Sequence, residues 1–226
     1  MIVEMQKWMK AYRDAMLALF GSRVLFIGLQ GSYARGEADE GSDIDVVLIL
    51  DGLSMNDLRE YRAALAGLPD RDRVCGFVCG RAELEGWQRA DLFQFYYDTL
   101  PCFGALDRLV SPPGTRDARA AVLSGACGLY HACSHLYLHH PDWEELAGLY
   151  KTAFFILQAK RFCETGEYVK SRAALEPRLE GKDLAVLRRA RLLREPCASR
   201  NELDASVETM LDWASGLIAA YRENFF

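Results

Sequence analysis

The feature that most constrains this chain is a Gly-Ser pair followed, a short distance on, by two aspartates at the start of an apolar run. Gly31 and Ser32 follow one aliphatic stretch, and Asp43 and Asp45 open a second stretch that continues to Leu50. Runs of β-branched and aliphatic residues of this length predict buried strands. Because side chains alternate between the two faces of a strand, Asp43 and Asp45 should point the same way.

Two carboxylates held this close on one face repel each other, so a cation between them is favoured. Mg²⁺ takes hard oxygen ligands and completes its coordination shell with phosphate oxygens, so we predict that Asp43 and Asp45 bind it. The turn at Gly31 and Ser32 offers backbone N–H groups and a hydroxyl that can hold a phosphate. The alternative is an ordinary acidic turn between two strands.

A Gly-Ser pair, ten intervening residues and Asp-x-Asp on a strand together resemble the signature of the DNA polymerase β-like nucleotidyltransferase superfamily. The full string GSYARGEADEGSDIDVVLIL, residues 31–50, is similar to the small-molecule branch that includes the aminoglycoside nucleotidyltransferases, a group linked to antibiotic resistance. The resemblance implies an Mg²⁺-dependent transferase that moves an NMP, with AMP as the first choice, from an NTP to a hydroxyl. It further implies a small-molecule acceptor of a cationic, aminoglycoside-like kind.

The same resemblance implies roles for individual residues. Gly31 and Ser32 would hold the β- and γ-phosphates, and Arg35 would either reach these phosphates or lie on a solvated helix face. In the second half, residues 165–174 are similar to the tail of the aminoglycoside enzymes, which makes Lys170 and Arg172 nucleotide-binding candidates. The alternative for these two residues is an ordinary helix–Gly–helix corner with solvated side chains.

The family also uses a third carboxylate early in the next strand, and this chain departs from that pattern. The expected position falls on Cys75 or Gly76, and neither a thiol nor a glycine is a useful Mg²⁺ ligand. Asp98 is the first candidate substitute as a catalytic carboxylate, and Asp72 is the second. Because this carboxylate is missing, an alternative is that the protein binds nucleotide or has a regulatory role without being catalytically active. A third hypothesis is a nucleotidyltransferase that modifies a protein and acts as an antitoxin. The large second half of the chain argues against it, because such antitoxins resemble the first domain alone.

The overall pattern predicts an α/β fold, with a nucleotidyltransferase domain over residues 1–113 and an all-α helical-bundle domain over residues 114–226. The boundary is placed at the Ser-Pro-Pro-Gly break of residues 111–114. In the first domain we expect a short mixed sheet flanked by helices, with strands over 23–30, 43–50, 73–79 and 103–110 and helices over 2–20, 56–66 and 82–99. In the second we expect helices over 116–139, 144–165, 182–194 and 202–225.

The composition limits the partners and the compartment. A net charge of −5 without a broad basic stretch argues against nucleic-acid binding. We find no apolar run of transmembrane length, and charged residues near the N-terminus argue against a signal peptide. Seven cysteines without a C-x-x-C pair suit reduced thiols. The sequence therefore predicts a cytoplasmic protein with no membrane partner, and it leaves the oligomeric state open, a homodimer included.

A second set of metal-ligating residue types recurs at every fourth position: Cys127, His131, His135 and His139. Successive steps of four residues drift by about 40° around a helix, so the four side chains cannot converge on one ion. No H-E-x-x-H pattern accompanies them. We therefore predict a polar helix face here rather than a metal site.

Overall fold

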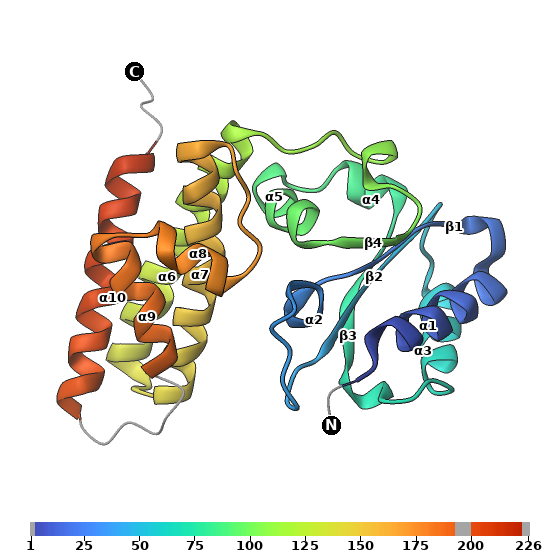
Figure 1. The fold of residues 1–226 in the computed structure, drawn as a ribbon, viewed down its shortest axis with the longest axis horizontal. Coiled ribbons are helices and arrows are strands. Elements are labelled where there is room, and N and C mark those ends of the chain that lie inside the picture. Colours follow the sequence, from blue (N-terminus) through green and yellow to red (C-terminus); the bar gives the residue numbers. More distant parts are fainter. Residues whose placement is uncertain (1–2, 193–199, 223–226) are drawn as a thin grey trace. The chain divides into compact units, whose positions relative to one another are not determined.

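The computed structural model describes residues 3–192 and 200–222 of the chain. It divides into two compact units (Figure 1). The first unit comprises Met1–Gln88 and Phe95–Pro112, and the second comprises Arg89–Gln94 and Pro113–Phe226.

The first unit is a four-stranded mixed sheet flanked by helices, as the sequence predicts. Its elements are α1 (Met5–Phe20), β1 (Val24–Leu29), α2 (Gly31–Arg35), β2 (Ile44–Leu50), α3 (Met55–Leu65), β3 (Val74–Gly80), α4 (Arg81–Glu85), the end of α5 (Arg89–Asp98) and β4 (Leu100–Phe103). The strand order is β3-β2-β1-β4. Strand β1 runs antiparallel to β2 and β4, whereas β2 and β3 are parallel.

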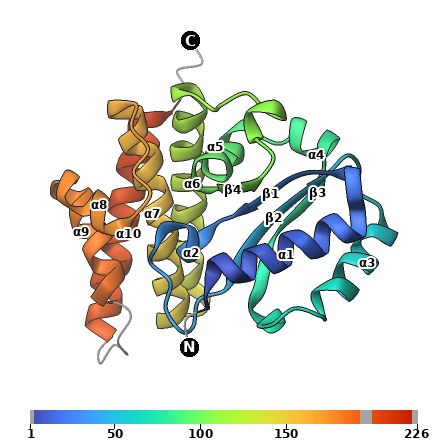
Figure 2. The same cartoon turned by 45° about the vertical axis from the view of Figure 1, so that its right-hand side comes forward.

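The core of this unit lies between the sheet and α1. Apart from Asp45, strand β2 is aliphatic, and all its aliphatic residues are buried. Helix α1 contributes Trp8, Tyr12 and Met16 to the same core, at steps of four residues that keep them on one face of an amphipathic helix. Helices α1 and α3 pack against each other on one face of the sheet (Figure 2). The Tyr12 and Tyr61 hydroxyl oxygens are 3.1 Å apart and link the two helices.

The predicted last strand is wrong in position. The strand is β4, Leu100–Phe103, and the predicted range 103–110 instead contains a single 3-10 turn, Leu106–Arg108. Strand β4 pairs only with β1, so it is an edge strand and tolerates Pro101, which cannot donate to a second neighbour. The predicted continuous helix over 82–99 is also two helices, α4 and α5, which are interrupted at residues 86–88.

The second unit is helical, again as predicted. Its helices are α6 (Thr115–His139), α7 (Trp143–Thr165), α8 (Arg172–Leu175), α9 (Gly181–Leu192) and α10 (Arg200–Tyr221). Helix α6 packs against both α7 and α10, and α9 packs against α7. Gly166, at φ +72°, ends α7 in the left-handed conformation. The last predicted helix, 202–225, extends beyond the described residues.

Helix α5 contributes to both units. Its first six residues, Arg89–Gln94, belong to the second unit, where the Arg89 guanidinium lies 2.8 Å from the Asp117 carboxylate. Within the described residues, every helix is too short or too polar to span a lipid bilayer.

Candidate active site

The Gly-Ser turn and the start of β2 lie directly against each other. The Gln30 N–H donates to the Asp45 carbonyl oxygen at 2.8 Å, and α2 begins at the next residue. Gly31 has φ +69°, and a Cβ built on it would lie 1.9 Å from Oδ2 of Asp45. Residue 31 must therefore be glycine for two reasons, its backbone conformation and the space that the Asp45 carboxylate occupies.

Asp45 sits in an environment that disfavours its own negative charge. Burial raises the pKa of the Asp45 carboxyl, and the neighbouring Asp43 and Asp98 carboxylates raise this pKa further, whereas the Arg35 guanidinium lowers it. Asp43 lies just before β2 and is exposed, and Asp45 is only partly exposed. The structure thus places Asp43, Asp98 and Arg35 near enough to act on Asp45.

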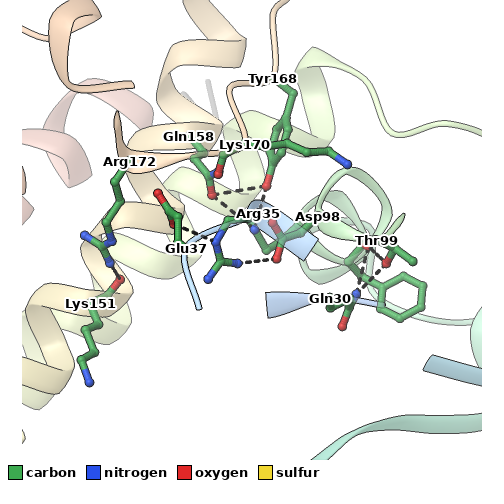
Figure 3. A network of polar contacts seen from close by, with 12 residues as sticks. Gln30, Arg35, Glu37, Asp98, Thr99, Lys151, Gln158, Tyr168, Lys170 and Arg172 are labelled. Carbon is green, nitrogen blue, oxygen red and sulfur yellow. Dashed lines mark hydrogen bonds and ion pairs between the residues drawn. The ribbon is translucent and has the colours of Figure 1, made fainter. Parts of the chain in front are cut away.

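Arg35, at the end of α2, is held between two carboxylates (Figure 3). Its Nη1 lies 2.7 Å from Oδ2 of Asp98, and its Nε lies 3.3 Å from Oε2 of Glu37. The side chains of Arg35 and Asp98 are only 11% and 7% exposed. Arg35 is therefore not the solvated side chain that one of the two sequence-based interpretations describes.

The end of α5, which carries Asp98, is held by contacts of its neighbouring residues. The Gln30 side-chain amide donates to Oγ1 of Thr99 at 2.7 Å and to the carbonyl of Phe95 at 3.1 Å (Figure 3). A Cβ on Gly28 would lie 2.5 Å from Cγ2 of Thr99, so β1 and the end of α5 are in close contact. These contacts place Asp98 beside α2, although 63 residues separate it from Arg35 in the sequence.

The neighbouring strand β3 carries no carboxylate beside Asp45. Cys75 pairs with Asp45 in the parallel ladder, and Gly76 pairs with Val46. Gly76 has φ +138°, and a Cβ there would lie 1.9 Å from the Val46 carbonyl oxygen, so no side chain fits at this position. Cys75 is exposed. The second candidate substitute, Asp72, has a side chain that is 90% exposed and pairs with Arg71 at 3.3 Å.

Lys170 and Arg172 lie in the second unit, beside the end of α7 in sequence, and each has a structural contact there. The Arg172 guanidinium stacks 4.3 Å from the centroid of the Phe154 ring and donates to the Lys151 carbonyl oxygen at 3.3 Å. The main-chain carbonyl of Lys170 accepts a 2.9 Å hydrogen bond from the buried Gln158 (Figure 3). Their nucleotide-binding role stays a prediction.

The histidines at every fourth position of α6 are exposed, and their rings lie next to one another. The ring centroids of His131 and His135 are 6.2 Å apart, and those of His135 and His139 are 4.6 Å apart. In the part of the chain that the structure describes, no group of three or more His, Cys, Asp or Glu side chains is arranged to bind a metal.

A mixed sheet with a glycine turn against an Asp-x-Asp strand, followed by a helical unit, is a nucleotidyltransferase-type architecture. The sequence model of the nucleotidyltransferase domain matches residues 7–68. The protein adenylyltransferase MntA of Thermococcus cleftensis is 38% identical over 69 residues, which are 29% of this chain and 68% of that protein. The chain belongs to the nucleotidyltransferase family, in the DNA polymerase β-like superfamily, and is a nucleotidyltransferase enzyme.

The fold is also similar to a solved structure along nearly the whole chain. The spectinomycin adenyltransferase AAD(9) of Enterococcus faecialis, solved with ATP and spectinomycin, superposes with a TM-score of 0.60. The match covers 93% of this chain and 99% of that one, at 11% sequence identity. At this identity the likeness establishes the fold, and the helical unit is part of it.

Proposed function

We propose that this protein is an Mg²⁺-dependent adenylyltransferase that moves AMP from ATP to a hydroxyl group of a small molecule. The observation that carries the proposal is the Asp43–Asp45 pair at the start of β2, packed against Gly31 of the Gly-Ser turn. In this proposal the nucleotidyltransferase domain spans residues 1–113, and the helical-bundle domain spans residues 114–226.

The residues present fit a divalent cation. Asp43 and Asp45 offer hard oxygen ligands, and burial and the neighbouring Asp43 raise the pKa of Asp45, so a cation there would be favourable. We assign the metal-binding role to these two carboxylates. Bound there, Mg²⁺ would relieve their repulsion and neutralise charge on the triphosphate, which is its usual contribution to nucleotidyl transfer.

The protein's own groups would position the nucleotide. Gly31 and Ser32 would hold the β- and γ-phosphates through the backbone N–H groups of the turn and the Ser32 hydroxyl. Arg35 supplies positive charge next to the carboxylates, and Lys170 and Arg172 are further candidates for phosphate contacts. Asp98 is the candidate catalytic carboxylate in place of the missing one, because it is the nearby acidic group that acts on Asp45 besides Asp43.

A small-molecule acceptor is favoured by the extent of the structural likeness. The fold shared with a spectinomycin adenyltransferase includes the helical unit, and that protein is named for a small-molecule acceptor. The net charge of −5 is compatible with a cationic acceptor.

A protein acceptor is the second candidate, and one observation favours it. The relative at 38% identity is named as a protein adenylyltransferase, and the aligned region of 69 residues amounts to 29% of this chain. A catalytically silent nucleotide-binding protein is the third candidate, because Cys75 replaces the expected carboxylate beside Asp45.

A pyrophosphate-release assay separates the three candidates. The purified protein is incubated with Mg²⁺ and each of the four NTPs, first alone, then with a panel of aminoglycosides and other hydroxylated small molecules, and then with a cell extract of proteins and radiolabelled ATP. We expect release with ATP and a small molecule. Label that appears only on protein supports the second candidate. Nucleotide binding without release under any condition supports the third.

A further inference from the structure

The Arg35–Asp98 pair stands out because it is nearly buried yet lies beside a site that should bind charged ligands. Arg35 contacts Asp98 at 2.7 Å and Glu37 at 3.3 Å, and the side chains of Arg35 and Asp98 are about one-tenth exposed. Charge-assisted hydrogen bonds of this length are among the stronger polar contacts in proteins, and burial reduces their screening by solvent. These contacts hold the Arg35 guanidinium against the Asp98 carboxylate.

The pair is also tied into the same local framework as the carboxylates. Gly31, at the first position of α2, touches Asp45, and Arg35 is the last residue of this one-turn helix. Gln30, directly before α2, binds Asp45 through its main chain and the Phe95–Thr99 end of α5 through its side chain. One short segment thus connects Asp45, Arg35 and the helix end that carries Asp98.

The groups around this segment carry more negative than positive charge. Asp43, Asp45 and Asp98 are acidic, and Arg35 opposes them at Asp45. A fixed guanidinium next to a carboxylate pair lowers the negative potential that a divalent cation experiences there. It also leaves positive charge close to where phosphate groups would lie.

We propose, on the basis of the proposed function, that Arg35 is a built-in counter-cation of the metal site and that Asp98 is the positioning residue that holds it beside Asp45. The positive charge of Arg35 weakens the binding of a free divalent cation, so that the cation enters together with the nucleotide. The negative charge of Asp98 and the positive charge of Arg35 act on the cation in opposite directions. Asp98 therefore acts in two ways. It holds Arg35 in position, and its negative charge attracts the cation.

The test is a double-mutant cycle with Mn²⁺ alone as the probe, measured by titration calorimetry without nucleotide. Arg35→Gln should tighten Mn²⁺ binding by about three- to tenfold, the scale on which one charge acts on a divalent ion across a few ångströms of solvated protein. Asp98→Asn should weaken Mn²⁺ binding by a similar factor. The double variant should return close to the parent affinity, and Arg35→Lys should shift it less than Arg35→Gln does.

A second ion pair in the same unit provides the matched control. Arg23 and Asp57 lie 2.6 Å apart, and neither is among the groups that act on Asp45. Arg23→Gln and Asp57→Asn should lower thermal stability and leave Mn²⁺ affinity within about twofold of the parent.

The outcomes separate this inference from the proposed function. If the parent protein binds Mn²⁺ and both Arg35→Gln and Asp98→Asn leave its affinity unchanged, or shift it in the same direction, the pair is merely structural and the inference is wrong. If the parent binds neither Mn²⁺ nor Mg-ATP, the proposed function is contradicted, and the inference falls with it.

Discussion

Gly31 and Asp45 approach each other so closely that a Cβ on residue 31 would lie 1.9 Å from the Asp45 carboxylate oxygen. This contact joins the Gly-Ser turn to the carboxylate strand, so a side chain at residue 31 should disturb both. We expect Gly31→Ala to weaken Mg-ATP binding at least about tenfold, because it displaces Asp45 and fills the space next to it. Fluorescence titration with Mg-ATP measures this loss.

Gly36 provides the matched control for this substitution. Its φ is +71°, close to that of Gly31, but a Cβ there meets no atom within 4 Å. Gly36→Ala should therefore cost about 1–2 kcal/mol of unfolding free energy through backbone strain and leave Mg-ATP binding intact. Equal losses of binding in the two variants would show that backbone conformation, rather than contact with Asp45, is what matters.

Replacing Lys170 and Arg172 tests whether the helical unit takes part in nucleotide binding. If Lys170 contacts phosphate, Lys170→Ala should weaken Mg-ATP binding by about 1–3 kcal/mol. Its unfolding free energy should hardly change, because the hydrogen bond from Gln158 uses the main-chain carbonyl, which alanine keeps. Arg172→Ala should also lose about 0.5–1 kcal/mol of stability with the Phe154 stacking. If both variants bind Mg-ATP with the affinity of the parent, Lys170 and Arg172 do not contact the nucleotide and their role is structural.

Placing a carboxylate at position 75 tests the missing ligand. Cys75 pairs with Asp45 in the strand ladder and is exposed, so Cys75→Asp adds negative charge beside Asp45 without disturbing the core. If Asp98 fulfils the role, pyrophosphate release should fall at least about tenfold in Asp98→Asn and rise little in Cys75→Asp. Cys75→Ser is the control without charge. A large gain in Cys75→Asp, with no loss in Asp98→Asn, would instead indicate a degenerate site.

Acid should destabilise the first unit through Asp57. Hydrogen bonds from Arg23, and then from Ser54, hold the pKa of the Asp57 carboxyl well below its usual range. A carboxyl whose pKa is depressed by folding contributes stability above its unfolded pKa of about 4, and this contribution is lost as the pH falls toward the folded pKa.

The variant Asp57→Asn should therefore be less stable than the parent at neutral pH. It should also lose less unfolding free energy between pH 7 and about pH 3, because it has no carboxyl to protonate at residue 57. Urea unfolding at the two pH values measures this difference, and parallel losses in parent and variant would contradict the assignment to Asp57.

The sequence predicts those parts of the fold whose signal is local. Apolar runs make up β1 and β2 apart from Gly28 and Asp45, and the four-residue spacing of Trp8, Tyr12 and Met16 matches their burial in α1. Strand β4 is misplaced because it is four residues long, carries Pro101 and is stabilised by pairing with β1, which no local pattern reveals.

The residues of the candidate site also fall into a group that the local sequence predicts and a group that it does not. Asp43, Asp45, Gly31 and Ser32 belong to one continuous motif, so the sequence reveals their proximity. The pairing of Arg35 with Asp98 depends on the way α5 returns to the sheet through Gln30 and Thr99. No local sequence pattern indicates that two charged residues so far apart form an ion pair. The sequence does mark each of them separately as a candidate site residue.

The most direct test of the central claim is Mg²⁺-dependent ATP binding by the parent and by the double variant Asp43→Asn, Asp45→Asn. The substitution removes both negative charges with almost no change in volume, and it should leave the fold intact or slightly more stable, because the repulsion at Asp45 is relieved. We predict that the parent binds Mg-ATP and that binding by the variant is lost. A variant that binds Mg-ATP as tightly as the parent would contradict the account.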